Sequence, residues 1–139
     1  MGSNENERTC APVTVEAWPR PKGYANGVVA TGRTLYVAGQ IGWEPDGTFA
    51  RTDFVGQLDK ALENVLEVVK AAGGGPEHIA RLTIYVTDLD AYRNDLKAIG
   101  QVYRTRMGKV FPAMALVGVA GLVERQALVE IEATASLPA

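Results

Sequence analysis

The stretch from Phe54 to Pro76 constrains the fold more than any other part of the chain. Its apolar residues recur at helical spacing, which predicts one amphipathic helix with a stripe of Phe54, Leu58, Leu62, Val65, Leu66 and Val69. Asp53 or Thr52 is placed to cap its start. The run from Gly73 to Pro76 ends it, because glycine adopts the backbone of a helix end and proline lacks an N–H. Since these glycines follow a helix and not a strand, they are not a phosphate-binding loop.

Alternating patterns on both sides of this helix predict strands. In residues 80–86, Leu82, Ile84 and Val86 alternate with Arg81, Thr83 and Tyr85. Further strands are expected at 13–16, 24–30, 34–38, 113–119 and 127–134, with 24–30 and 34–38 paired as a hairpin across residues 31–33. A second helix is expected after Asp88 or Asp90, with a stripe of Tyr92, Leu96, Ile99, Tyr103 and Met107. The order β-β-β-α-β-α-β-β predicts an α+β fold.

The length and composition fit one domain. The chain has 139 residues, of which 47% are hydrophobic and 22% charged, enough for a core without disulfides or a structural metal. We expect residues 1–12 to be a flexible N-terminal stretch and residues 13–139 to form the single domain. The net charge of -2 argues against nucleic acid or a membrane surface as a partner.

Cysteine content and hydropathy predict the compartment. Cys10 is the one cysteine, so no intrachain disulfide can form. The first residues contain no apolar segment typical of a signal peptide, and no apolar run approaches the roughly 18 residues of a membrane helix. These features predict a cytoplasmic protein.

The strands are too apolar for the sheet to stand alone. Two helices can cover only one face of a sheet. The segments YVAG, MALVGVA and ALVEIEA would then expose apolar residues on the other face. Such a surface is usually hidden by another subunit, so we expect an oligomer.

Few residues are candidates for chemistry. His78 is the one histidine and is expected at the surface, and no set of three or four metal ligands is apparent, so neither metal nor cofactor is predicted. Glu130 and Glu132 point to the same side of a strand, where they could act as general acid or base or simply form its wet face. Tyr24 could orient a substrate or be a strand-end aromatic residue. Asn64 is expected to bond to backbone.

Several segments together resemble the RidA/YjgF family. They are KGYANGVVATGRTLYVAGQIG, FVGQLDKALENVLEVVKAAG, HIARLTIYVTDLDAY, FPAMALVGVAGL and VEIEATA, which occur in the order found in that family from about residue 19 to residue 135. The resemblance implies a chorismate-mutase-like fold with a six-stranded mixed sheet and two helices on one face. It also implies a homotrimeric barrel with ligand clefts between subunits.

The resemblance also implies a site. In deaminating members an arginine grips the carboxylate of a 2-imino acid, and that position is Met114 here, which carries no charge. The glutamate that positions the attacking water falls on Glu130, and the tyrosine of the cleft falls on Tyr24. The two backbone donors fall on Gly39 and Leu116. Another basic residue could replace the arginine from the neighbouring subunit, and Arg33, Lys109 and Arg125 are the candidates. The alternative is a different ligand that is more apolar near Met114.

These residues lead to three hypotheses. The first is a small-molecule hydrolase of the deaminase type that acts on an imine, an enamine or a related metabolite. The second is a ligand-binding or regulatory trimer without catalysis. The third, ranked last, is an endoribonuclease or translation inhibitor, which would need a basic surface that the sequence lacks.

Overall fold

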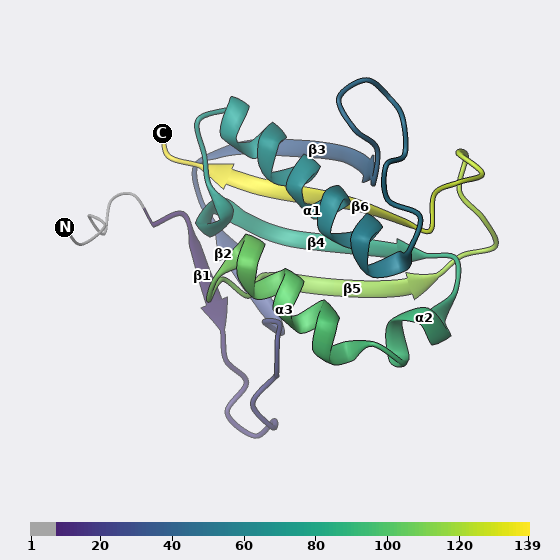
Figure 1. Ribbon diagram of the computed structural model, residues 1–139. Coiled ribbons are helices and arrows are strands. Elements are labelled where there is room, and N and C mark those ends of the chain that lie inside the picture. The colour runs from purple at the N-terminus through teal and green to yellow at the C-terminus, as the bar shows by residue number, and fades with distance from the viewer. Residues whose placement is uncertain (1–7) are drawn as a thin grey trace.

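A four-stranded mixed sheet forms the centre of the molecule (Figure 1). The structure is a computed structural model, and it describes residues 8–139. The strands are β3 (Arg33–Ile41), β6 (Val129–Leu137), β4 (Ile79–Val86) and β5 (Ala113–Gly118), adjacent in that order. Strand β6 is antiparallel to both of its neighbours, whereas β4 and β5 are parallel. A parallel pair needs a crossover connection, which here contains the helices between β4 and β5.

Helix α1 (Phe54–Ala71) matches the sequence prediction closely. The Asp53 carboxylate caps it by accepting the Gly56 N–H at 2.9 Å. At the other end Gly73 has a φ of +91°, a conformation that favours glycine, and Pro76 starts the short 3₁₀ helix η2 (Pro76–His78). The predicted cap and the predicted stop are both confirmed.

The second predicted helix is two helices. Helix α2 (Leu89–Arg93) is capped by Asp88, and α3 (Leu96–Met107) follows after a break at residues 94 and 95. Asn and Asp side chains compete with the helix for backbone hydrogen bonds, which explains an interruption at this point. Leu96, expected in the apolar stripe, is 56% exposed. The prediction of one continuous helix was wrong.

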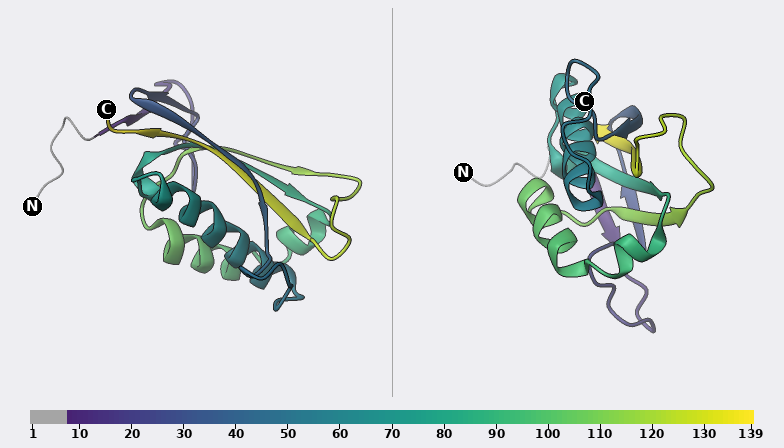
Figure 2. Two further views of the ribbon diagram at one scale, coloured as in Figure 1. Left: turned by 90° about the horizontal axis from the view of Figure 1, so that it is seen from above. Right: turned by 45° about the vertical axis from the view of Figure 1, so that its right-hand side comes forward.

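Helices α1 and α3 lie on the same face of the sheet, as predicted (Figure 2). The core between them is closed by β4 and β6, where Leu82, Val86 and Ile131 have no exposed surface. The alternation predicted for these strands is confirmed, because Arg81 and Glu132 are exposed on the opposite face. That face carries no helix, and on it the edge residue Tyr36 is 79% exposed.

The expected six-stranded sheet was wrong, because the first two strands form a separate ribbon. Strands β1 (Cys10–Val13) and β2 (Gly27–Ala30) pair with each other, and β3 pairs with β6 instead. The expected hairpin of 24–30 with 34–38 is therefore absent: the chain turns at Gly32, where φ is +119°. Local sequence could not show that residues 10–13 compete for the same partner.

The start of the described chain is part of the fold. Residues 1–12 were predicted to be a flexible stretch, but Thr9 is buried and Cys10 starts β1. Residues 1–7 lie outside the described part of the chain. Within residues 8–139 no helix is long and apolar enough to cross a membrane.

Candidate functional site

Glu130 lies against a glycine on the helix-free face of the sheet. Strand β6 presents Glu130 on this face, and register places it beside Ile41 of β3 and Tyr85 of β4. The pairing of β3 with β6 shifts between Val37 and Gln40, so Gly39 lies in an irregular stretch. A Cβ atom on Gly39 would lie 2.7 Å from the Glu130 carboxylate carbon. A side chain at position 39 would displace the Glu130 carboxylate from this place, so the two predicted site residues are in contact.

The second carboxylate of the strand is already engaged. The Tyr85 hydroxyl donates a 2.6 Å hydrogen bond to Oε1 of Glu132. This bond favours the protonated phenol and raises the pKa of Tyr85, and the nearby charges of Glu132 and Glu130 act in the same direction. Glu130 has no hydrogen-bond partner among the described residues and is partly buried. The two carboxylates are thus distinct: Glu132 is held by a tyrosine, and Glu130 is available to a ligand or a water.

Tyr24 and Met114 line one cavity of about 380 Å³, which is also lined by residues of α1 and α3 on the helix-covered face of the sheet. The Ala25 N–H donates to the Pro112 carbonyl at 3.0 Å, which fixes the segment bearing Tyr24 beside the start of β5. Met114 pairs in register with Leu82, so its side chain points to the helix-covered face and packs against the core. Tyr24 is 43% exposed at the opening.

Leu116 presents its backbone to the outer edge of β5. The Val119 N–H donates to the Val86 carbonyl of β4 at 2.9 Å, and backbone groups of alternate residues point to opposite sides of a strand. The carbonyl of Pro112, just before β5, points away from β4 to Ala25, so the backbone groups of even-numbered residues in this strand point away from β4. The Leu116 N–H therefore faces away from β4, where no strand is paired with it in the described residues. This orientation suits the predicted role as a backbone donor.

One chain does not bring the five predicted residues together. Gly39 and Glu130 belong to the β3 side of the sheet, whereas Tyr24, Met114 and Leu116 belong to β5 or its neighbourhood at the opposite edge. The side chains of Glu130 and Met114 also point to opposite faces. The five residues thus form two separate groups, one at the β3–β6 side of the sheet and one around β5.

Within one chain, none of Arg33, Lys109 and Arg125 lines the cavity beside Met114, so the expectation that one of them enters from a neighbouring subunit stays a prediction. Arg33 donates to the Pro138 carbonyl at 3.0 Å, Lys109 lines a different cavity, and Arg125 is exposed in the loop before β6. The cations that line the Met114 cavity are Lys22 and Arg104. Sequence reasoning missed Arg104, although it lies on the expected second helix one position beyond Tyr103 of its apolar stripe.

His78 is a structural residue and not the surface residue predicted from the sequence. It is 8% exposed, and its Nδ1 accepts the Gly75 N–H at 3.0 Å. Since this nitrogen is used as an acceptor, the 3.8 Å approach of Glu77 becomes an ion pair only if the histidine gains a proton. The histidine side chain thus satisfies the backbone N–H of the last glycine in the run.

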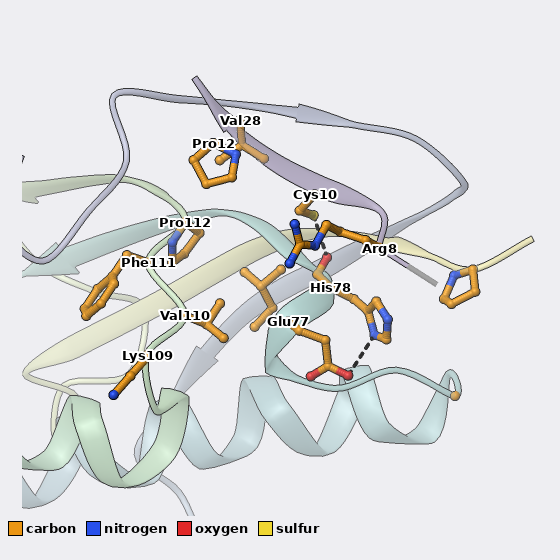
Figure 3. Close-up of a pocket in the computed structure, with 13 residues that line it drawn as sticks. Arg8, Cys10, Pro12, Val28, Glu77, His78, Lys109, Val110, Phe111 and Pro112 are labelled. Atoms are coloured by element: carbon orange, nitrogen blue, oxygen red, sulfur yellow. Dashed lines mark hydrogen bonds and ion pairs between the residues drawn. The ribbon is translucent and has the colours of Figure 1, made fainter. Parts of the chain in front are cut away.

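A cavity of about 720 Å³ beside His78 contains none of the predicted site residues (Figure 3). Cys10 and Lys109 line it. The Cys10 thiol donates to the His78 carbonyl at 3.5 Å, and burial raises the pKa of this thiol. A protonated thiol is a poor nucleophile, so the groove lacks an activated group. Within residues 8–139 no three His, Cys, Asp or Glu side chains are grouped to hold a metal ion.

Two polar residues of α1 support the strands that carry Gly39 and Glu130. The Asn64 side chain donates to the carbonyls of Ile41 and Trp43 at 2.9 and 3.0 Å, which confirms its predicted structural role. Gln57, which the sequence analysis did not single out, is 1% exposed and accepts the Leu128 N–H at 2.8 Å, just before β6. Its polar identity within the helical stripe was the available signal.

Fold and sequence together define the class of protein: the chain belongs to the RidA/YjgF family. The family model described as Endoribonuclease L-PSP matches residues 16–137. A RutC family protein of Pyrococcus horikoshii is 32% identical over 124 residues, covering 88% of this chain and 94% of that protein. The 2-iminobutanoate/2-iminopropanoate deaminase of Capra hircus is 34% identical over 118 residues, covering 84% of this chain and 82% of that protein.

Solved structures of relatives have the same fold. A Rid family protein of unknown function from Yersinia pestis is similar with a TM-score of 0.83 and 32% identity, over 93% of this chain and 99% of that one. RidA from an Antarctic Psychrobacter has a TM-score of 0.66 and 28% identity, over 96% of this chain and 97% of that one. Several relatives, including that of Capra hircus, are named imine deaminases, which hydrolyse a C–N bond, and one solved relative from Entamoeba histolytica with 26% identity is titled a putative endoribonuclease.

Proposed function

We propose that this chain is a hydrolase of the imine-deaminase type, with its site formed between two copies of the chain. The observation that carries the proposal is the contact of Glu130 with Gly39, which leaves one carboxylate partly buried and unpaired among the described residues. Such a group can hold a water and accept its proton. The water oxygen attacks the imine carbon to give a carbinolamine, and the proton accepted by Glu130 passes to the nitrogen. The C–N bond then breaks, and ammonia and a carbonyl compound leave.

The second half of the site would come from the neighbouring copy. Strands β3 and β5 are the two edges of the main sheet. A head-to-tail contact that joins the β3 side of one copy to the β5 side of the next closes into a ring when the rotation allows it. In such a ring Glu130 and Gly39 face the Tyr24 hydroxyl and the Leu116 N–H of the neighbour. We propose a homotrimer of this kind.

Met114 restricts which imines we expect the chain to hydrolyse. Without a cation at position 114, a small 2-imino acid such as 2-iminopropanoate loses a charged partner for its carboxylate, so we expect weak turnover of it. If no imine releases ammonia while a small ligand still raises the melting temperature, the chain is a ligand-binding trimer without catalysis. The absent cation is the observation that favours this second candidate.

The experiment measures ammonia release from imines generated freshly by an amino-acid oxidase or dehydratase. Glu130→Gln keeps the size of the side chain and removes the base, so it should abolish turnover. Glu132→Gln is the matched control, since Glu132 is on the same face of the same strand and a glutamine still accepts the Tyr85 hydroxyl. Equal turnover in both variants would exclude Glu130 as the base. Light scattering on the same samples reports the trimer.

A further inference from the structure

The cavity that contains Met114 has a largely apolar lining to which two cationic residues are added. Buried residues of α1 and of the sheet form the floor, among them Leu58, Leu82 and Ile131. Lys22 and Arg104 line the same cavity and are exposed. In the described part of the chain neither side chain forms an ion pair or a hydrogen bond. Two cations without partners thus stand at the mouth of an apolar space.

A glycine in α3 contributes to this arrangement. Gly100 lies inside the helix, where glycine destabilises relative to alanine, and it lines the cavity. A Cβ atom there would lie 3.4 Å from Nη1 of Arg104. The Arg104 guanidinium therefore lies over position 100, where an added Cβ atom would be in van der Waals contact with it.

The opening is framed by aromatic residues that are held in place. The Tyr103 hydroxyl donates to the Val110 carbonyl at 2.6 Å, and its ring stacks on Phe111 with a centroid distance of 5.8 Å. Phe111 leads into β5 and is 40% exposed at the same opening as Tyr24. A rigid aromatic rim of this kind fits an extended apolar group better than a small polar one.

We infer that the ligand of this site is an acid with a bulky apolar side chain, which enters the cavity beside Met114 while its carboxylate pairs with Arg104 and Lys22. In this arrangement the grip on the carboxylate comes from α3 and from the segment before Tyr24, and not from position 114. The substrate class is then a 2-imino acid with a branched or aromatic side chain. The inference rests on the proposed function for the location of the site, but binding can test it without turnover.

The test is calorimetric binding of stable 2-keto acids to the full chain in its native assembly. The probes are pyruvate and 4-methyl-2-oxopentanoate, together with 4-methylpentan-2-one, which lacks the carboxylate. Each buried CH₂ strengthens binding about fourfold, and three additional carbons give an upper bound of about sixtyfold. We expect 4-methyl-2-oxopentanoate to bind at least tenfold more tightly than pyruvate. Equal affinity of the two acids would overturn the inference.

Variants separate the two features of the cavity. Arg104→Gln should weaken 4-methyl-2-oxopentanoate at least fivefold and leave the neutral ketone unchanged, and Arg104→Lys should restore part of the loss. Arg93→Gln is the matched control, since that exposed helical arginine lies outside the cavity and pairs with Asp90. Gly100→Leu should weaken the bulky acid and not pyruvate. An Arg104→Gln variant that binds the acid like the control would contradict the assigned role, even if Gly100→Leu does not fold.

The ammonia assay distinguishes this inference from the proposed function. Size-dependent binding without turnover of any imine would leave the ligand class standing and reject the hydrolase. Turnover of small and bulky imino acids at equal efficiency would leave the hydrolase standing and reject the ligand class.

Discussion

Replacing Gln57 with leucine tests whether one buried amide holds the start of β6. Its Oε1 accepts the Leu128 N–H at 2.8 Å, and its Nε2 donates to the carbonyls of Arg51 and Gln126 at 3.2 and 3.0 Å. Leucine has nearly the same volume but makes none of these bonds. Three backbone groups of two loops would lose their partner at once, so Gln57→Leu should destabilise the fold.

The magnitude follows from the fate of each group. A Leu128 N–H left without an acceptor costs about 1–3 kcal/mol. The two carbonyls add about 1 kcal/mol together, because water reaches the exposed Gln126. Burial of the apolar leucine side chain stabilises the fold by about 1 kcal/mol. The expected net loss in the free energy of unfolding is about 2 kcal/mol.

Urea denaturation at a fixed protein concentration measures this loss, since assembly would otherwise shift the midpoint. With a slope of about 2 kcal/mol per molar urea, the midpoint should fall by about 1 M. Gln101→Leu is the matched control, because Gln101 is exposed on α3, and it should change stability by less than about 0.5 kcal/mol. Equal midpoints for the two variants would refute the argument that Gln57 anchors β6.

Three further predictions concern other parts of the chain. The Asp59 carboxylate accepts hydrogen bonds from Arg106, and these bonds lower the pKa of Asp59 below its usual 3.8. The ionised carboxylate therefore stabilises the fold above pH 3.8, and this stabilisation is lost as the pH falls through the lowered pKa. Asp59→Asn should therefore cost about 1 kcal/mol at neutral pH and progressively less below pH 3.8, while the exposed Asp90→Asn should have little effect at any pH, as urea titrations will show. Because Cys10 is the one cysteine and burial raises the pKa of its thiol, its labelling by a disulfide reagent at pH 8 should be slower in the folded than in the urea-unfolded chain, and equal rates would contradict this. Met114→Arg should raise ammonia release from 2-iminopropanoate relative to bulky imino acids, and an unchanged ratio would show that position 114 does not select the substrate.

The sequence predicted those elements whose signals are local. The limits of α1 follow from the Asp53 cap and the glycine run, and the faces of β4 and β6 follow from strict alternation. The errors arose where pairing over long distances decides the outcome. Strand β2 pairs with residues 10–13, although residues 33–41 follow it directly. Nothing in the period of either strand indicates which partner it takes.

The candidate site was predictable to the same extent. The resemblance singles out both Gly39 and Glu130, and the structure places them in contact on neighbouring strands; their roles in a site stay predictions. The cations near Met114 were not predictable. Lys22 and Arg104 are about 80 positions apart in the sequence, and only the packing of α3 on the sheet brings both to one cavity.

The Met114 side chain points into the cavity between α3 and the sheet. A charged side chain at this position would have to share the space between α3 and the sheet with the buried residues Leu82 and Ile99. Burying a charge among such groups is costly unless a partner is present. A methionine removes that cost and leaves a flexible apolar wall. If the proposed site is correct, methionine at position 114 would weaken the grip on a small acid and favour a ligand with a larger apolar part, whose carboxylate a cation at the rim would hold.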